Sequence, residues 1–119
     1  MKINVPQFIG NTMCTLPNDA EKLRTKLVTN IQKKETSFID FKGATDIISR
    51  FINLALGQLL ETVSESEFDE FIKIDYEGLD PDDEVIIKRA LESAKEYYRN
   101  SAVLRPLEKG IFEETESDA

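Results

Sequence analysis

The segment that most constrains the fold is residues 37–61, SFIDFKGATDIISRFINLALGQLLE. Its first part belongs to a short run, residues 36–41, whose aromatic and β-branched side chains are typical of a buried central strand. Gly43 then turns the chain, and a helix is expected at residues 46–63. Because a buried strand followed by an apolar helix is half of an α/β unit, this segment predicts a sheet packed against helices.

The helix expected at residues 46–63 is apolar around most of its circumference. Such a wide apolar face favours a helix that packs against a sheet and a neighbouring helix. On a helical wheel Leu54 falls inside the narrow polar strip that contains Arg50 and Asn53. We therefore expect an exposed leucine beside Arg50, of the kind that anchors a protein partner.

Two further elements are expected in the N-terminal third of the chain. Residues 2–9 are expected to form an edge strand, because Pro6 lacks the amide hydrogen that a central strand needs. A helix is expected from Asn18 to Lys34, with Asn18 and Glu21 forming a capping box at its start.

The C-terminal half continues the alternation of strands and helices. Residues 71–76 alternate in polarity and predict a third strand, preceded by a possible capping box at Ser64 and Glu67. An Asp-Pro pair, a strong signal for a helix start, opens a helix expected at residues 80–100.

The resulting order, β-α-β-α-β-α, predicts an α/β protein with a small mixed or parallel sheet of three to four strands. We expect a single domain over residues 1–100 and an acidic C-terminal tail over residues 101–119. A fourth strand would come from residues 103–113, at Val103–Leu104 or Ile111–Phe112. Homodimerisation through a strand edge is the other way to cover the sheet.

Charge and composition narrow the classes of partner. The 119 residues carry a net charge of −8, which disfavours nucleic acid and anionic membrane surfaces and favours a basic protein partner. No signal peptide and no stretch long and apolar enough to span a membrane is visible. With a single cysteine, Cys14, the composition fits a bacterial cytoplasmic domain.

Residues that usually support catalysis are missing from the sequence. Without histidine, the chain lacks the commonest general base and the usual transition-metal ligand. Its five glycines do not form a phosphate-binding loop, and the acidic run at residues 80–84 lacks the spacing of a calcium loop. We therefore expect no enzymatic activity, no cofactor and no metal ion.

The turn from the central strand into the following helix is the candidate site. Ligands and partners tend to contact such strand-to-helix turns of α/β sheets. Ser49 is expected in the first helical turn, where a phosphate group would meet free backbone N–H groups, and Arg50 is adjacent.

Segment 38–61 resembles the STAS-like domain family of unknown function. The resemblance lies in a strand ending in Asp40-Phe41, the turn Gly43-Ala44, the step from Ser49 to Phe51, and the small-Gly-x-Leu pattern from Ala55 to Leu59. It extends more loosely to about residue 95, and it covers neither the N-terminal strand nor the tail.

This resemblance implies a STAS-type fold, in which helices pack on a small mixed sheet. The better-known relatives, anti-anti-sigma factors, bind histidine-kinase-like ATPases and are switched by phosphorylation of a serine at the start of the corresponding helix. Where those relatives carry Ser-Ser-Gly, this chain has Ser49-Arg50-Phe51. Arg50 aligns with the phosphorylated serine, and Ser49 is the candidate phosphorylation site.

These features predict a non-enzymatic regulatory module that binds a protein partner, a histidine-kinase-like ATPase or a similar regulator, through residues 42–53. The expected contact residues are Lys42, Asp46, Ser49, Arg50, Asn53 and Leu54. The alternative is an acidic immunity protein or antitoxin on a STAS-like scaffold. It would neutralise a basic toxin through an acidic surface made of Glu65, Glu67, Asp69, Glu70 and the tail.

Overall fold

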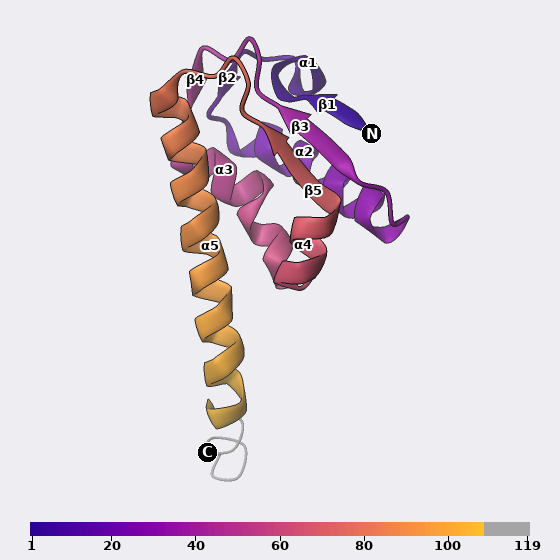
Figure 1. Ribbon diagram of the computed structural model, residues 1–119, viewed down its shortest axis with the longest axis vertical. Helices are drawn as coiled ribbons and strands as arrows, with labels where there is room; N and C mark the ends of the chain where they lie inside the picture. The colour runs from indigo at the N-terminus through magenta and orange to yellow at the C-terminus, as the bar shows by residue number, and fades with distance from the viewer. Residues whose placement is uncertain (109–119) are drawn as a thin grey trace.

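A three-stranded parallel sheet forms the centre of the protein. The computed structural model describes residues 1–108, and it describes side chains as far as residue 100. The sheet has the order β1-β3-β5, with β1 at Lys2–Asn4, β3 at Ser37–Asp40 and β5 at Ile72–Asp75. Both pairings are parallel, so the α/β class and the central position of the strand within residues 36–41 are confirmed (Figure 1).

A second, two-stranded parallel sheet and the helices complete the fold. The small sheet pairs β2, Met13–Cys14, with β4, Asp46–Ile47. In chain order the helices are α1 (Val5–Ile9), α2 (Pro17–Gln32), α3 (Ser49–Ala55), the 3₁₀ helix η1 (Gly57–Glu61), α4 (Glu65–Phe71) and α5 (Pro81–Glu108). In Figure 1 α5 runs along one side of the molecule and continues past the rest of the fold.

The first strand is shorter than the sequence predicts. It ends at Asn4, whose side chain accepts a hydrogen bond from the backbone N–H of Gln7 at 3.0 Å and caps α1. Pro6 lies in the first turn of this helix, where its missing N–H costs nothing. The edge position of the strand is confirmed, but a strand over residues 2–9 is wrong because Asn4 caps a helix and Pro6 is compatible with its first turn.

The start of α2 also differs from the prediction. The helix begins at Pro17, one residue before Asn18, and no side chain caps it. Proline at the first helical position already has the right backbone angle and no amide to satisfy, so the expected cap at Asn18 is not used. The helix ends at Gln32, two residues earlier than expected.

The single helix expected at residues 46–63 is divided into three elements. Asp46 and Ile47 pair with β2 and are therefore extended. The α-helix begins at Ser49 and ends at Ala55, and η1 follows from Gly57. Glycine favours helix poorly, and Gly57 lies against α5, so the chain tightens into a 3₁₀ turn there.

Helix boundaries with strong local signals are confirmed. Ser64 and Glu67 form a capping box at the start of α4, in which each side chain accepts a hydrogen bond from the other residue's backbone N–H. At the start of α5, Asp80 accepts a hydrogen bond from the N–H of Asp82 at 3.0 Å. Both caps satisfy backbone amides that a helix leaves unpaired.

The last helix is longer than the prediction of an end at about residue 100. Its backbone continues to Glu108, so a strand at Val103–Leu104 is wrong. The division into a domain over residues 1–100 and a tail over residues 101–119 stays a prediction. The remaining expectations for this region, a strand at Ile111–Phe112 and the acidic end of the tail, lie outside the described residues. No helix in the described part of the chain has the length and apolarity needed to cross a membrane.

The core lies between the sheet and the helices behind it. Ile39 and Phe41 are buried. Phe38 lies on the central strand, where we expected it to be buried, but its side chain is 50% exposed. Successive side chains of a strand point to opposite faces, and in Figure 1 α2 covers only one face of this sheet. On the open face, Phe38 pairs in register with Lys2 of β1 and Lys73 of β5.

Candidate functional site

A groove of about 820 Å³ lies between the first turn of α3 and the middle of α5. Three of the predicted contact residues line it: Ser49, Arg50 and Asn53. They lie one helical turn or less apart on α3, so they share one exposed face of that helix. The rest of the lining comes from η1 and α5: Gln58, Glu61, Arg89, Ala90, Ser93, Ala94, Tyr97 and Tyr98.

Ser49 is the first helical residue of α3, as the sequence predicts. The residue before it, Ile48, has extended backbone, and its side chain accepts no capping hydrogen bond. Ser49 and Arg50 are both exposed, so the first turn of the helix is accessible rather than sealed in the core. This accessibility is what a contact surface at this turn requires.

The other three predicted contact residues, Lys42, Asp46 and Leu54, do not line the groove. Lys42 follows β3, and its carbonyl oxygen accepts a hydrogen bond from the side chain of Asn4 at 2.9 Å. Asp46 lies in β4 near the start of α5, where its charge helps to raise the pKa of Asp83 after the larger effects of burial and Asp80.

Leu54 is half-buried against the core rather than exposed. Its carbonyl oxygen accepts a hydrogen bond from Nη1 of Arg24 at 2.9 Å, which places this part of α3 beside α2. The helical wheel failed here because it assumed one long helix with one open side. In the structure α3 is packed between two helices, so the predicted leucine anchor is absent from the groove.

Sequence reasoning missed the half of the groove that α5 provides. Arg89, Ser93 and Tyr97 recur at four-residue intervals and therefore form one stripe along the helix. Tyr97 is 64% exposed. The four-residue repeat was the available signal, but only the packing of α5 against α3 shows that this stripe faces Arg50.

Two arginines in the groove lack a carboxylate partner. Among the described residues, neither Arg50 nor Arg89 forms an ion pair. The other cationic side chains of α5 up to residue 100 are paired: Lys88 with Glu84 at 2.6 Å, Lys95 with Asp69 at 2.7 Å and Arg99 with Glu65 at 2.7 Å. Glu61 also lines the groove, so its lining carries two guanidinium groups and one carboxylate, a local excess of positive charge in a chain of net charge −8.

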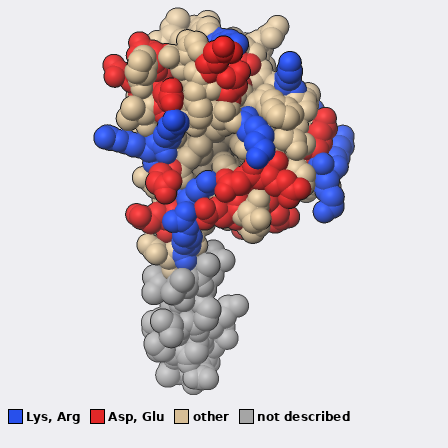
Figure 2. Space-filling model, in the orientation of Figure 1, with Lys and Arg blue, Asp and Glu red and all other residues tan. Residues whose placement is uncertain are grey.

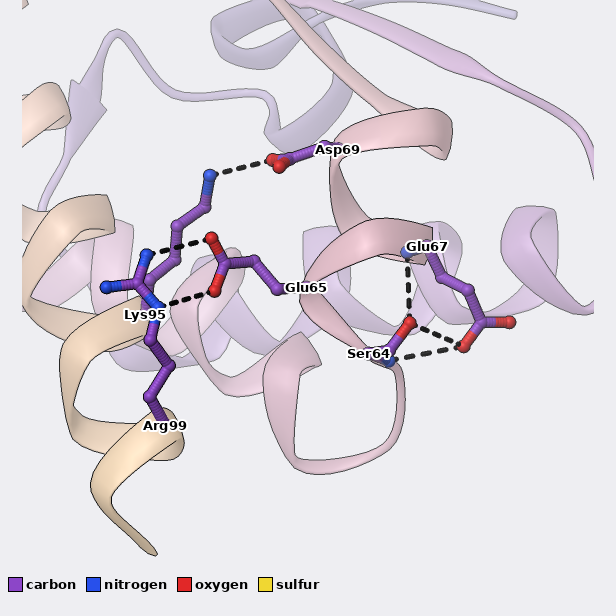
Figure 3. Close-up of polar contacts among 6 residues, drawn as sticks. All are labelled: Ser64, Glu65, Glu67, Asp69, Lys95 and Arg99. Atoms are coloured by element: carbon purple, nitrogen blue, oxygen red, sulfur yellow. Dashed lines mark hydrogen bonds and ion pairs between the residues drawn. The ribbon is translucent and has the colours of Figure 1, made fainter. Parts of the chain in front are cut away.

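Three of the four carboxylates predicted to form an acidic surface around α4 have partners within the protein, as Figure 3 shows. Arg99 donates from Nε and Nη2 to the two carboxylate oxygens of Glu65, at 2.7 and 2.9 Å. This hydrogen-bonded pair lowers the pKa of Glu65 and raises the pKa of Arg99. Lys95 donates to Asp69, and Glu67 closes the capping box with Ser64. Figure 2 shows Lys and Arg side chains beside the acidic side chains low on this face of the molecule.

The structure supplies no obvious reactive centre among the described residues. Cys14 is fully buried, and this burial, followed by the charges of Asp19, Asp46 and Asp83, raises the pKa of its thiol to about 11. A buried neutral thiol is a poor nucleophile and a poor metal ligand. No group of three or more cysteine or acidic side chains in the described part of the chain is arranged to hold a metal ion.

The fold and the groove define a small α/β domain with a candidate binding site between two helices. The model of the family described as STAS-like domain of unknown function (DUF4325) matches residues 19–84. This is more than half of the chain, and the protein belongs to that family. The resemblance seen in the sequence is thus confirmed. No curated protein and no solved structure matches the chain.

The residues matched by the family model include only one side of the groove. Ser49, Arg50 and Asn53 of α3 lie within the matched residues, whereas Arg89, Ser93 and Tyr97 of α5 lie beyond them. One side of the groove therefore belongs to the matched region, and the other side is formed by the part of α5 beyond residue 84.

Proposed function

We propose that this protein is a non-enzymatic regulatory module that binds an anionic segment of a protein partner in the groove between α3 and α5. The observation that carries the proposal is the pair of exposed, unpaired arginines, Arg50 and Arg89, on opposite sides of one groove. Resemblance to anti-anti-sigma factors makes a histidine-kinase-like ATPase the first partner to test.

The chemistry of the lining suits such a segment. A guanidinium group binds a carboxylate or phosphate through two parallel hydrogen bonds, which fixes orientation as well as charge. Tyr97 offers an exposed ring for apolar contact at one end of the groove, and the side chains of Asn53 and Ser93 can donate hydrogen bonds.

Phosphorylation of Ser49 would act on the same site. A phosphoserine carries a charge of about −1.5 to −2 and would lie next to Arg50 at the mouth of the groove. It would compete with an anionic partner for that guanidinium group. We propose that phosphorylation of Ser49 weakens partner binding.

Charge reversal tests the proposed function. The wild-type protein is used to capture partners from the native cell, and the captured ATPase or regulator is then titrated with purified variants. Arg50→Glu and Arg89→Glu should each weaken binding about 10- to 30-fold, the size expected for an interface arginine at a hot spot. Lys73→Glu, an exposed cation on the sheet, is the matched control. Wild-type affinity in both arginine variants, with unchanged circular dichroism, would remove the groove from consideration.

The neutralising alternative gains no support from the structure. An immunity protein or antitoxin of the predicted kind needs free carboxylates around α4. Glu65 and Asp69 are ion-paired with α5, and Glu67 caps its own helix, so of the four only Glu70 has no ion pair or hydrogen bond among the described residues. A basic toxin that bound Glu65 or Asp69 would compete with Arg99 or Lys95 for these carboxylates.

A further inference from the structure

Hydrogen-bond donors from three separate elements line the groove between α3 and α5. Arg50 of α3 and Arg89 of α5 contribute guanidinium groups that form no ion pair among the described residues. The third element, η1, contributes Gln58. Nη1 of Arg24, on α2, donates to Oε1 of Gln58 at 2.6 Å, so the amide oxygen of Gln58 is already used and its NH2 group is the free end.

Arg24 holds the amide of Gln58 in this orientation. The same Nη1 donates to the carbonyl oxygen of Leu54 at 2.9 Å, and Nη2 forms an ion pair with Glu21 at 3.7 Å, so the guanidinium group is fixed from several sides. Reversing the amide would place the NH2 group of Gln58 against the guanidinium group, donor against donor. Gln58 therefore offers the groove a donor.

Charged acceptors are few in the lining of the groove. Glu61 supplies its one carboxylate, and Oε1 of Glu61 already accepts a hydrogen bond from the hydroxyl of Tyr98 at 3.1 Å. A ligand for the two guanidinium groups and the amide of Gln58 needs negative charge and several acceptor oxygens. A phosphate monoester has three such oxygens and a charge of about −1.5 to −2, whereas a carboxylate has two oxygens and a single charge.

We propose that the groove recognises a phosphorylated side chain of the partner protein, with the phosphate held by Arg50, Gln58 and Arg89. This inference rests on the proposed function and deepens it, because it names the anion that the partner carries. Arg24 is a positioning residue in this site, since it acts through the amide of Gln58 and does not touch the phosphate.

Tyr97 suits the groove to a phosphorylated peptide segment rather than to free phosphate. It follows Arg89 by eight residues on α5, which is about 12 Å along the helix at about 1.5 Å per residue. An extended chain covers about 3.3 Å per residue, so a side chain about four residues from the phosphorylated one reaches the ring of Tyr97. The ring is 64% exposed, and an apolar side chain at that distance would cover it.

Isothermal titration calorimetry on the full chain tests the proposal. The probe is a nine-residue peptide with blocked termini, phosphoserine at its centre, leucine at both ends and alanine elsewhere, so that it can bind in either direction. The comparison ligands are the same peptide with glutamate at the centre, the same peptide with serine there, and inorganic phosphate. All titrations use one ionic strength, because charge-driven binding depends on salt.

We expect the phosphopeptide to bind at least ten-fold more tightly than each comparison ligand, since each lacks either the phosphate or the apolar contact. Tyr97→Ala should weaken binding of the phosphopeptide and leave binding of inorganic phosphate unchanged. Equal affinity for the glutamate peptide would overturn the assignment of a phosphate. Equal affinity for inorganic phosphate would overturn the assignment of a peptide segment, and no binding of the phosphopeptide at millimolar concentration would overturn the whole proposal.

Variants of the lining locate the phosphate. Arg50→Gln, Gln58→Leu and Arg89→Gln should each weaken phosphopeptide binding about ten-fold, whereas Lys73→Gln, at an exposed cation of the sheet, should leave it unchanged. Arg24→Met should also weaken binding, but it should add no loss when Gln58 is already leucine. An added loss in that double variant would overturn the positioning role of Arg24. Wild-type affinity in all three lining variants, with wild-type circular dichroism, would overturn the site.

Phosphatase treatment separates this inference from the proposed function. The partner captured from the native cell is titrated with the wild-type protein before and after its phosphate groups are removed. We expect at least a ten-fold loss of affinity after treatment. Unchanged affinity after treatment, together with weaker binding by Arg50→Glu and Arg89→Glu, would overturn the phosphate and leave the proposed function standing. Wild-type affinity in both charge-reversal variants would instead remove the groove itself.

Discussion

Gly57 in η1 and Ala94 in α5 pack so closely that a Cβ atom added to Gly57 would lie 3.0 Å from the Cβ of Ala94. The same added atom would lie 2.6 Å from Oδ1 of Asn53. The amide of Asn53 can rotate away, but Ala94 is buried on a helix backbone and cannot. This contact limits how closely η1 can pack against α5 next to the groove.

We therefore predict that Gly57→Ala destabilises the protein by about 1–3 kcal/mol, the usual cost of overpacking a core position. Urea denaturation followed by circular dichroism measures it. The double variant Gly57→Ala with Ala94→Gly should lose less stability than the sum of the single variants, because the second change removes the clash. Additive losses of stability would show that the side chains at the two positions do not clash.

The buried hydrogen bond between α2 and β3 gives a second stability prediction. Asn30 and Ser37 are 1% and 0% exposed, and Nδ2 of Asn30 donates to Oγ of Ser37 at 3.0 Å. Ser37→Ala removes the acceptor and should cost about 1–3 kcal/mol, the penalty for an unsatisfied buried donor. Ser66→Ala, at an exposed position of α4, is the matched control and should change stability little. Equal denaturation midpoints for the two variants would contradict the prediction.

The pair between Glu65 and Arg99 predicts a dependence of stability on pH. The pKa of Glu65 lies below its ordinary value of 4.5, because the folded state holds the carboxylate against Arg99. The folded protein therefore binds fewer protons there than the unfolded chain. The pair stabilises the fold above pH 4.5, and this stabilisation is lost as the pH falls through the lowered pKa.

Glu65→Gln should accordingly be less stable than the wild type at neutral pH, and the difference should vanish in acid. Glu70→Gln, an exposed carboxylate of the same helix without an ion pair in the described structure, is the control. The quantity to measure is the difference in the free energy of unfolding between the wild type and the variant. Asp83, whose pKa is raised mainly by burial, contributes to the pH dependence of both proteins with the opposite sign, and this contribution cancels in the difference. A difference that persists unchanged at low pH would rule out the ion pair as its source.

Elements fixed by local chemistry could be predicted from the sequence. The central strand, the strand at β5, the capping box at Ser64 and the start of α5 all depend on residues within a few positions of one another. Boundaries that depend on distant contacts could not. The break at Gly57 reflects a contact with Ala94, and the exposure of Phe38 reflects which face of the sheet the helices cover.

The candidate site also contains residues that the sequence could predict and residues that it could not. Ser49 and Arg50 were predictable because a strand-to-helix turn exposes its first helical residues. Arg89 was not, because its place opposite Arg50 depends on how α5 packs. Arg99 has an ion-pair partner because α4 places Glu65 beside it, whereas Arg89 has none among the described residues. No pattern within α5 alone distinguishes the two arginines.

The burial of Cys14 gives a prediction about the reactivity of its thiol. Its thiol is fully buried, and burial is the largest of the effects that raise its pKa from 9.0 to about 11. At neutral pH this shift alone leaves about 100-fold less thiolate than an unperturbed cysteine would have. Reaction with a chromogenic disulfide reagent should therefore be at least 100-fold slower for the native wild type than for the urea-unfolded chain.

The single variant Ser93→Cys, with an exposed thiol in the groove, should show one fast phase in the native state and leave Cys14 unreacted. Two fast phases would mean that the β2-β4 region opens readily and that Cys14 is accessible in the native state. Cys14→Ala should remove the second phase, and it should destabilise the fold only by the loss of a small buried apolar group.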